Sequence, residues 1–237
     1  MKKIIMLFLI LTLSLSLSAC KADTKNNSDT KKKETTSQDN TKKEKKKEAI
    51  SAPIALTTTY THGTWVENVY QNPYLKLQFT LPENWTIQPE EYLAYNSDTT
   101  AEIYASNDLI IQNLGDIGQL LEMTAIDEPT QANTLIGLNN RAVMENKEIT
   151  LPEFAETLKK GLLGHPTVKF DITDTLEEEF LNETYVTFSA TATKEGMTQK
   201  FYLKNHENFI LMIMITSPTS GGMSVENIAS NFSGLTS

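Results

Sequence analysis

Cysteine is nearly absent from this chain, which has one among 237 residues, at position 20. A single thiol excludes disulfides within the chain and a zinc site built from several cysteines. Nucleophile motifs are missing too, because neither Gly-x-Ser-x-Gly nor Ser-x-x-Lys followed by its partner motifs occurs. The three histidines, His62, His165 and His206, have no metal-ligand spacing and stand beside turns or the linker, so surface or turn positions are expected. No residue qualifies as catalytic, and we expect a protein that is not an enzyme.

Long apolar runs are also scarce, and the first is Ile4 to Leu17, directly after the basic residues Lys2 and Lys3. The run is shorter than the ~20 residues of a comfortable membrane-spanning helix. A basic start, a short apolar run and small residues at its end are typical of a cleavable export signal. We therefore interpret residues 1–19 as a signal peptide.

The signal peptide ends in Leu17, Ser18, Ala19 and Cys20. This tetrapeptide resembles the bacterial lipobox, Leu-[Ala/Ser]-[Gly/Ala]-Cys. The resemblance implies that diacylglycerol and an N-acyl chain are attached to Cys20, that cleavage occurs before it, and that no other cofactor is needed. Acyl chains contribute ~0.8 kcal/mol per buried methylene, so the expected location is the extracytoplasmic face of the cell membrane. An ordinary signal peptide with a coincidental cysteine, or an uncleaved anchor, is the alternative.

Residues 20–60 are predicted to be a disordered tether. From Lys21 to Glu48 there is no aromatic residue and no apolar side chain larger than alanine, so no core can form. Lysine dominates this segment. Contact between its lysine runs and anionic wall polymer or lipid head groups is one hypothesis, and a simple spacer is the other.

The remaining residues, 61–237, are expected to form one globular domain that is strongly acidic. From residue 51 onward there are nine basic and 24 acidic residues, a net charge of −15. Such a surface repels phosphate backbones, which argues against nucleic acid as a partner. Asp171 and Asp174 begin an acidic stretch that continues through Glu179, and they are candidate calcium ligands. The alternative is a solvated acidic connection, because no Asp-x-Asp-x-Asp-Gly loop is present.

Alternating apolar residues and turn formers predict an α+β fold, with an antiparallel sheet flanked by helices. A capping box of Thr150 and Glu153 predicts a helix over 151–163, and Ser224 caps a last helix whose inward residues extend to Phe232. The run 209–215 is apolar on both alternating faces, which predicts a central strand covered on both sides. The other predicted elements are a hairpin of 65–70 and 74–81, a helical turn at 89–95, and hairpins over 102–113 and 135–144 that turn at Asn107-Asp108 and at Asn139-Asn140. Strands are predicted near 167–174, 184–193 and 197–204, with a turn at Glu195-Gly196.

The order of these elements resembles the PsbP-like and Mog1-like α/β/α sandwich of many small bacterial lipoproteins. The residues that carry the resemblance are Phe79 to Trp85, Glu102 to Ser106, the helix 151–163, Asn182 to Tyr185, Gln199 to Tyr202, Phe209 to Thr216 and the closing helix to Phe232. Residues 115–148 fit this pattern poorly and are expected to be an insertion or an elaborated edge. The resemblance implies an accessory or binding role and brings no catalytic motif.

Three functions follow from these observations. The preferred one is a tethered, non-catalytic module that binds an envelope protein or wall component through a sheet face or edge. A solute-binding lipoprotein that serves a transporter is the second, although such proteins usually have two lobes and a longer chain. An envelope hydrolase with a carboxylate pair is the third. The sequence contains many Asp and Glu residues, but they form no recognisable catalytic arrangement.

Overall fold

The computed structural model describes residues 59–97 and 99–235. The signal peptide, the lipobox with Cys20 and almost the whole tether lie outside the described residues. The described residues belong to one compact unit. Tyr60, assigned to the tether from the sequence, is only 1% exposed, so the folded part already includes this residue. None of the helices in 59–97 and 99–235 has the length and apolar character needed to cross a membrane.

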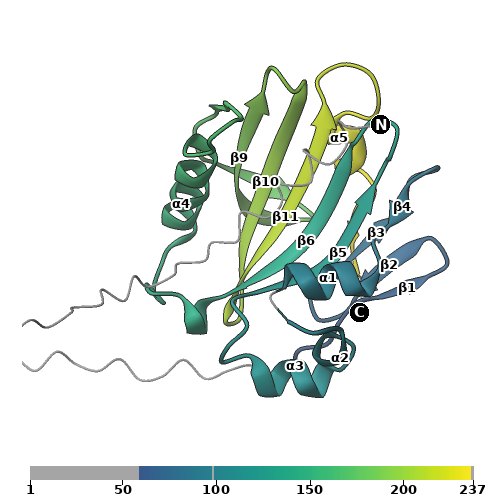
Figure 1. Cartoon of the computed structure of the whole chain (residues 1–237), viewed down its shortest axis with the longest axis vertical. Helices are drawn as coiled ribbons and strands as arrows, with labels where there is room; N and C mark the ends of the chain where they lie inside the picture. The colour runs from purple at the N-terminus through teal and green to yellow at the C-terminus, as the bar shows by residue number, and fades with distance from the viewer. Residues whose placement is uncertain (1–58, 98, 236–237) are drawn as a thin grey trace, which may run out of the picture. The chain divides into compact units, whose positions relative to one another are not determined.

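A large antiparallel sheet forms the centre of the domain (Figure 1). Its strand order is β4-β5-β6-β11-β10-β9-β7, and β8 pairs with β9 next to β7. The strands are β4 (Thr86–Ile87), β5 (Gln119–Ile126), β6 (Asn133–Asn140), β7 (Asp171–Ile172), β8 (Leu176–Phe180), β9 (Glu183–Ala192), β10 (Met197–His206) and β11 (Phe209–Pro218). Every pairing in it is antiparallel, which together with the flanking helices confirms the predicted α+β class.

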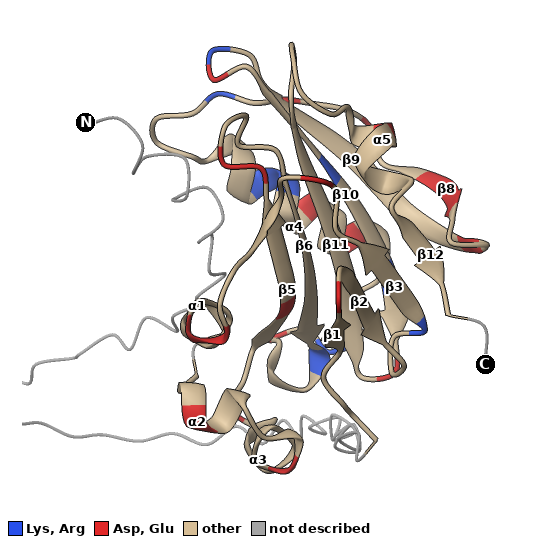
Figure 2. Ribbon diagram, turned by 90° about the vertical axis from the view of Figure 1, so that its right-hand side faces the viewer, with Lys and Arg blue, Asp and Glu red and all other residues tan. Residues whose placement is uncertain are grey.

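A smaller antiparallel sheet packs on one face of the central sheet (Figure 2). Its order is β1-β2-β3-β12, with β1 (Thr64–Val66), β2 (Val69–Asn72), β3 (Leu77–Thr80) and β12 (Phe232–Gly234). One buried cluster joins the two sheets, since Leu77 and Phe79 of β3 share it with Leu211 and Ile213 of β11. The main hydrophobic core therefore lies between the sheets.

The helices are short except for α4. They are α1 (Glu90–Asn96), α2 (Ala101–Tyr104), α3 (Asn107–Asn113), the 3₁₀ turn η2 (Arg141–Val143), α4 (Leu151–Leu163) and α5 (Val225–Ala229). α1 contacts β5, α4 contacts β9 and β10, and α5 contacts β10 and β11. The boundaries of α4 and its capping box are as predicted. Ser224 caps α5 as expected, but this helix ends early and Phe232 lies in β12 instead.

Of the two hairpins predicted in the first half of the domain, one is confirmed in part and one was wrong. β2 and β3 pair antiparallel, as the hairpin predicted over 65–70 and 74–81 requires. Residues 65–70 do not form one strand, because Glu67 adopts a φ of 54° in a tight turn that separates β1 from β2. Residues 102–113 form the helices α2 and α3 rather than a hairpin. The hydroxyls of Thr100 and Ser106 accept hydrogen bonds from backbone N–H groups three residues later, and these caps start the two helices.

Residues 115–148 are not an elaborated edge of the sheet. They supply β5 and β6, and β6 lies directly beside β11 in the interior of the central sheet. The predicted turn at Asn139 and Asn140 was also wrong, because β6 continues through both residues. The Asn140 amide donates to the carbonyls of Leu114 and Ile117 at 2.6 and 3.0 Å, which accounts for its burial at the end of a strand.

The second half of the domain follows the sequence expectations more closely. β11 lies between β6 and β10 with residues 209–215 buried, as the apolar run predicted. The turn after β9 is confirmed, with Gly196 at a φ of 66° where a side chain would be strained. The acidic stretch from Asp171 to Glu179 is not a simple connection, because it contains β7 and β8.

Candidate functional site

The most polar part of the core surrounds Glu122 in β5. The β5–β6 register shifts between Leu121 and Met123, so Glu122 is the extra residue of a β-bulge. A bulge redirects a side chain that regular alternation would place elsewhere. The Glu122 side chain is 0% exposed, although ionised carboxylates are rarely buried without partners.

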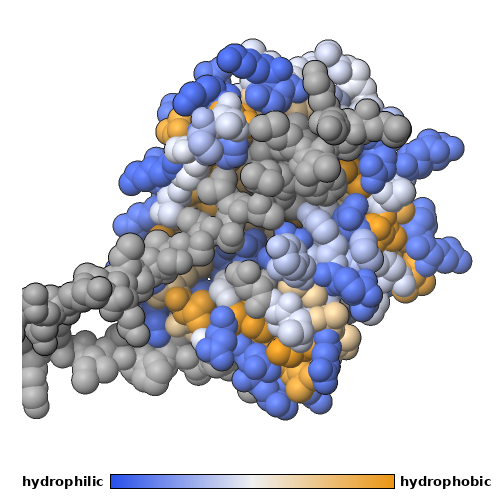
Figure 3. Space-filling view, viewed as in Figure 1, coloured by the Kyte–Doolittle hydropathy of each residue, from blue (hydrophilic) through white to orange (hydrophobic). Residues whose placement is uncertain are grey.

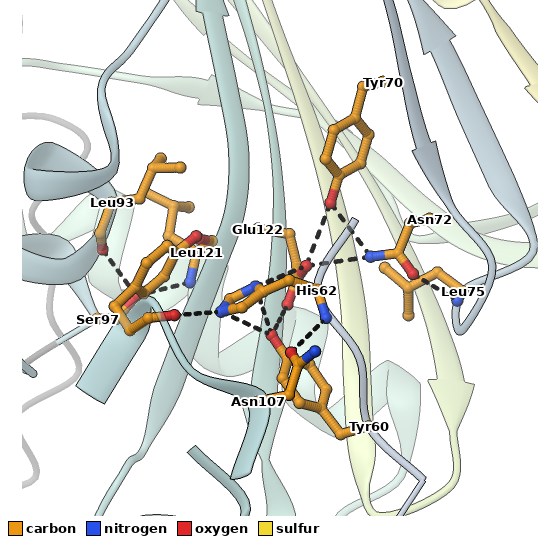
Figure 4. A network of polar contacts seen from close by, with 11 residues as sticks. Tyr60, His62, Tyr70, Asn72, Leu75, Leu93, Ser97, Asn107, Leu121 and Glu122 are labelled. Carbon is orange, nitrogen blue, oxygen red and sulfur yellow. Dashed lines mark hydrogen bonds and ion pairs between the residues drawn. The ribbon is translucent and has the colours of Figure 1, made fainter. Parts of the chain in front are cut away.

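Four side chains surround the Glu122 carboxylate (Figure 4). Oε1 accepts a hydrogen bond from the Tyr60 hydroxyl at 2.5 Å. Oε2 accepts from Asn72 Nδ2 at 3.0 Å and from the Tyr70 hydroxyl at 3.2 Å. His62 Nδ1 lies 3.4 Å from the same oxygen. A carboxylate has about four lone-pair sites, so these neighbours use its acceptor capacity. We call Glu122, Tyr60, His62, Tyr70 and Asn72 the Glu122 cluster.

The contacts of His62 set the protons within the cluster. Nε2 lies 2.9 Å from the carbonyl oxygen of Tyr104, which only accepts, so Nε2 carries a hydrogen. Nδ1 lies 2.7 Å from the Tyr60 hydroxyl, whose proton already points to Glu122. Nδ1 therefore faces both the Tyr60 hydroxyl and Glu122 Oε2. The backbone N–H of His62 donates to Asn107 Oδ1 at 2.9 Å, which fixes the ring beside α3.

The tyrosines of this region act as hydrogen-bond donors. Burial raises the pKa of Tyr60 and of Tyr70 well above the usual value, and the negative charge of Glu122 raises both further. Burial also raises the pKa of Tyr104, whose hydroxyl donates to the Leu121 carbonyl at 2.5 Å. These phenols therefore keep their protons at physiological pH. The cluster is arranged to hold chain segments together, since its donors and acceptors are paired with one another.

The three histidines differ in their surroundings. His62 lies in the Glu122 cluster with its side chain 17% exposed, so the expected surface position was wrong for this residue. His165 follows α4 in a turn, where its Nδ1 accepts from the backbone N–H of Val168 at 3.0 Å. His206 ends β10 beside a turn, and its ring packs edge-on to Tyr74 with centroids 4.6 Å apart. Burial lowers the pKa of His206.

The candidate calcium ligands remain at the edge of the central sheet. Asp171 in β7 accepts a hydrogen bond from the Thr193 hydroxyl at 3.2 Å, and Asp174 lies between β7 and β8. Within 59–97 and 99–235 no group of three or more His, Cys, Asp or Glu side chains is placed to hold a metal ion. The structure therefore does not gather Asp171 and Asp174 with a third ligand.

Sequence reasoning missed Glu122 as a site residue. One signal was present, because Glu122 is the single charged residue in the otherwise apolar or neutral strand Gln119–Ile126. Its partners Tyr60 and Tyr70 stand 62 and 52 positions away and could not be paired with it without the fold.

Comparison of the amino-acid sequence identifies no relative. No protein-family model matches the chain, and no curated protein matches it in sequence. The function is therefore argued from this chain's own residues.

Proposed function

We propose that this protein is a lipid-anchored accessory module of the bacterial cell envelope that acts by binding rather than by catalysis. In this proposal residues 1–19 are an export signal, Cys20 carries the lipid, and the segment up to Tyr60 is a tether. The domain would be held at the extracytoplasmic face of the membrane, where it binds an envelope component. The central sheet with α1 and α4 at its margins is compatible with the PsbP-like and Mog1-like resemblance, which remains part of the proposal.

The Glu122 cluster is the observation that carries this proposal. Tyr60 ends the proposed tether and His62 follows it, and both side chains contact a buried carboxylate in β5. Tyr70 and Asn72 of β2 bind the same carboxylate, so the entry of the chain is fixed to both sheets. Hydrogen bonds that fix the start of the folded chain to both sheets suit a domain that is attached through its N-terminal side. Because the carboxylate's acceptor sites are taken by neighbours, the cluster favours a structural role over catalysis.

The lipid anchor is tested by changing Cys20, the only cysteine, to serine. We expect the wild-type protein in the membrane fraction, with a mass that corresponds to a chain starting at an acylated Cys20. Cys20→Ser should abolish the lipid and release the protein from the membrane fraction or leave an unprocessed precursor. Ser16→Ala lies in the apolar run outside the lipobox and is the matched control, expected to behave as wild type. A wild-type chain that keeps residues 1–19, or carries an unmodified sulfur, would contradict the proposal.

A further inference from the structure

The central sheet has a second face, turned away from the small sheet. Leu211, Ile213 and Ile215 of β11 belong to the core between the sheets, so the alternate residues project from the opposite side. We call this side the outer face. Its residues form four rows, each with one residue from β6, one from β11 and one from β10. The rows are Asn133, Thr216 and Gln199; Leu135, Met214 and Phe201; Gly137, Met212 and Leu203; and Asn139, Ile210 and Asn205.

Helices flank the outer face at its two sides. α4 contacts β9 and β10, while α1 contacts β5. Figure 1 looks onto this face and shows β11 and β6 between the two helices. The middle of the face is therefore made of the side chains of β6 and β11. Met212, Met214 and Leu135 lie at its centre, and all three are buried, with 8%, 4% and 2% exposed.

The outer face carries no charge over β5, β6, β11 and β10. Each residue that projects from it on these strands is apolar or a neutral Asn, Gln, Thr or Gly. The domain around it has a net charge of −15 from residue 51 onward, which makes an uncharged area of this size unusual for the molecule. Figure 3 views the same side and shows hydrophilic residues along much of its outline.

One end of the outer face holds buried polar atoms without partners. Asn133, Thr216 and Gln199 are directly opposite one another on three adjacent strands. Asn133 Oδ1, Thr216 Oγ1 and Gln199 Oε1 are all buried, and no hydrogen-bond partner is present for them in the described part of the chain. Thr124 Oγ1, on the neighbouring β5, is in the same state. Gln199 is 6% exposed, Thr216 4% and Thr124 2%. We call these four residues the outer-face polar row.

Unpaired buried polar atoms destabilise a fold, and native proteins rarely keep several together. Directly opposite residues on paired strands have Cβ atoms about 4.5–5.5 Å apart, so Asn133 and Gln199, on either side of Thr216, are separated by roughly 10 Å. Thr124 is opposite Leu135 and lies beside these three. A head group with more than one hydroxyl can bridge this span. The unpaired atoms are amide oxygens, which accept, and threonine hydroxyls, which both accept and donate. A ligand that brings hydroxyl groups would satisfy both kinds.

We infer that the outer face binds an uncharged amphiphile with a single acyl chain and a hydroxyl-bearing head group. The head group hydrogen-bonds to Asn133, Thr216 and Gln199, and the acyl chain lies along β11 and β6 over Met214, Leu135 and Met212. This inference rests on the proposed function for its setting, because such amphiphiles are components of the membrane that the anchor would hold nearby. It deepens that function by naming the class of ligand.

The dimensions and the side chains of the face agree with this ligand. From Thr216 to Ile210 the strand advances six residues, roughly 20 Å at the usual rise, which accommodates a long acyl chain. Methionine side chains are flexible and polarisable and adapt to apolar ligands of varied shape. An α-helix from a protein partner uses its backbone groups internally, so it meets the outer-face polar row less directly than free hydroxyls do.

The first test uses the methionine methyl groups as site-specific reporters. The full chain with Cys20→Ser is labelled with ¹³C at the methionine methyls and titrated with 1-monopalmitoylglycerol below its micelle concentration. We expect saturable shifts of the Met212 and Met214 signals, assigned with Met212→Leu and Met214→Leu. Met123 faces the core between the sheets and is the internal control, expected to stay in place. Absence of saturable shifts at Met212 and Met214, or equal shifts at Met123, would overturn the inference.

The second test separates binding from stability. In the double variant Thr216→Val/Gln199→Met two unpaired polar groups are removed, so we expect the affinity for 1-monopalmitoylglycerol to fall at least tenfold while the melting temperature does not fall. Thr134→Val is the matched control on the opposite side of β6, where the Thr134 hydroxyl donates to the Met214 carbonyl at 3.0 Å. This control should lower the melting temperature and leave the affinity within twofold. Unchanged affinity in the double variant would contradict the assignment of the head group.

Failure of this inference is distinguishable from failure of the proposed function. Membrane fractionation of Cys20→Ser reads the anchor, whereas the titration reads the outer face in a chain that has no anchor. If the wild-type protein proved not to be lipid-anchored but still bound the ligand in a Gln199-dependent way, the proposed location would be wrong and the inferred ligand class would stand. Hexadecane has an alkyl chain but no head group. If it bound as tightly as 1-monopalmitoylglycerol, the inferred hydrogen bonds to the head group would be refuted, even if the lipid anchor were found.

Discussion

The domain contains two groups of buried polar side chains that differ in one respect. In the Glu122 cluster the carboxylate is surrounded by donors from the same chain, at 2.5 to 3.4 Å. In the outer-face polar row four buried oxygen atoms have no partner in the described residues. The first group is complete within the protein. The second is complete only with a molecule from outside, and this difference is why we assign structure to one and binding to the other.

The difference also appears in the parts of the chain that each group joins. The Glu122 cluster connects residues from the start of the domain, from β2 and from β5, so the loss of Glu122 removes an acceptor that buried donors from three parts of the chain share. The outer-face polar row lies on adjacent strands that are already held by backbone pairing. Removing a side chain from the row therefore leaves no protein group without its partner.

The largest effect is expected for Glu122→Ala. This change leaves the Tyr60, Tyr70 and Asn72 donors buried without their acceptor and removes the charge facing His62. Breaking a buried charged network in this way costs about 3–5 kcal/mol of unfolding free energy, measured by urea denaturation. Glu179→Ala, at an exposed position in β8, is the control and should stay within about 0.5 kcal/mol of wild type. Equal losses of unfolding free energy in both variants would show that the Glu122 cluster does not hold the fold together.

A smaller loss is expected for Tyr60→Phe, which removes only the hydroxyl that donates to Glu122 Oε1. Hydrogen bonds to a charged group contribute about 1.5–3 kcal/mol, so urea denaturation should show a loss in this range. Tyr95 is 77% exposed, and Tyr95→Phe should leave the stability unchanged. A Tyr60→Phe variant as stable as wild type would mean that the contact at the start of the domain does not hold the fold.

The change in stability should have the opposite sign for Thr216→Val, because a methyl group of the same shape replaces a buried hydroxyl that has no partner in the described residues. We expect the free energy of unfolding to be equal to wild type or higher by about 1 kcal/mol. The comparison Thr134→Val removes a paired hydroxyl and should lower it by about 1 kcal/mol. A loss in Thr216→Val as large as that in Thr134→Val would show that Thr216 has a structural partner.

The smallest effect concerns pH and His206. Burial is the main cause of its lowered pKa, and Lys204 and Lys76 act in the same direction while Glu207 opposes them. A histidine with a lower pKa in the folded state favours folding above its unfolded pKa of about 6.5, and this contribution is lost as the pH falls through the folded value. His206→Gln should therefore lose less stability than wild type between neutral pH and about pH 5. An identical pH profile in both proteins would remove His206 from the acid sensitivity of the fold.

Local signals in the sequence predicted part of this fold. The helix 151–163 was recognised because Thr150 and Glu153 cap it through contacts between near neighbours. The strands β9 to β11 were recognised from their turns and from the apolar run of β11. By contrast, Asn107 and Asp108 were taken as a hairpin turn, although Thr100 and Ser106 before them were helix caps.

Contacts between distant residues explain what the sequence alone did not predict. The end of β6 was not predicted, because Asn139 and Asn140 are turn formers and their amides are satisfied by the carbonyls of distant residues such as Ile210. Glu122 was recognisable as unusual in β5, but its four partners are assembled only by the fold. The outer-face polar row needed the strand register, because its residues are separated in the sequence by up to 92 positions.

The most direct test measures ligand affinity in one variant from each polar group. The full chain with Cys20→Ser is titrated with 1-monopalmitoylglycerol, alone and with either Tyr60→Phe or Thr216→Val/Gln199→Met. The account predicts that Tyr60→Phe binds within twofold of the parent although it is less stable, and that the double variant binds at least tenfold more weakly although it is not less stable. Weakened binding in Tyr60→Phe together with unchanged binding in the double variant would contradict the division between a structural and a binding group.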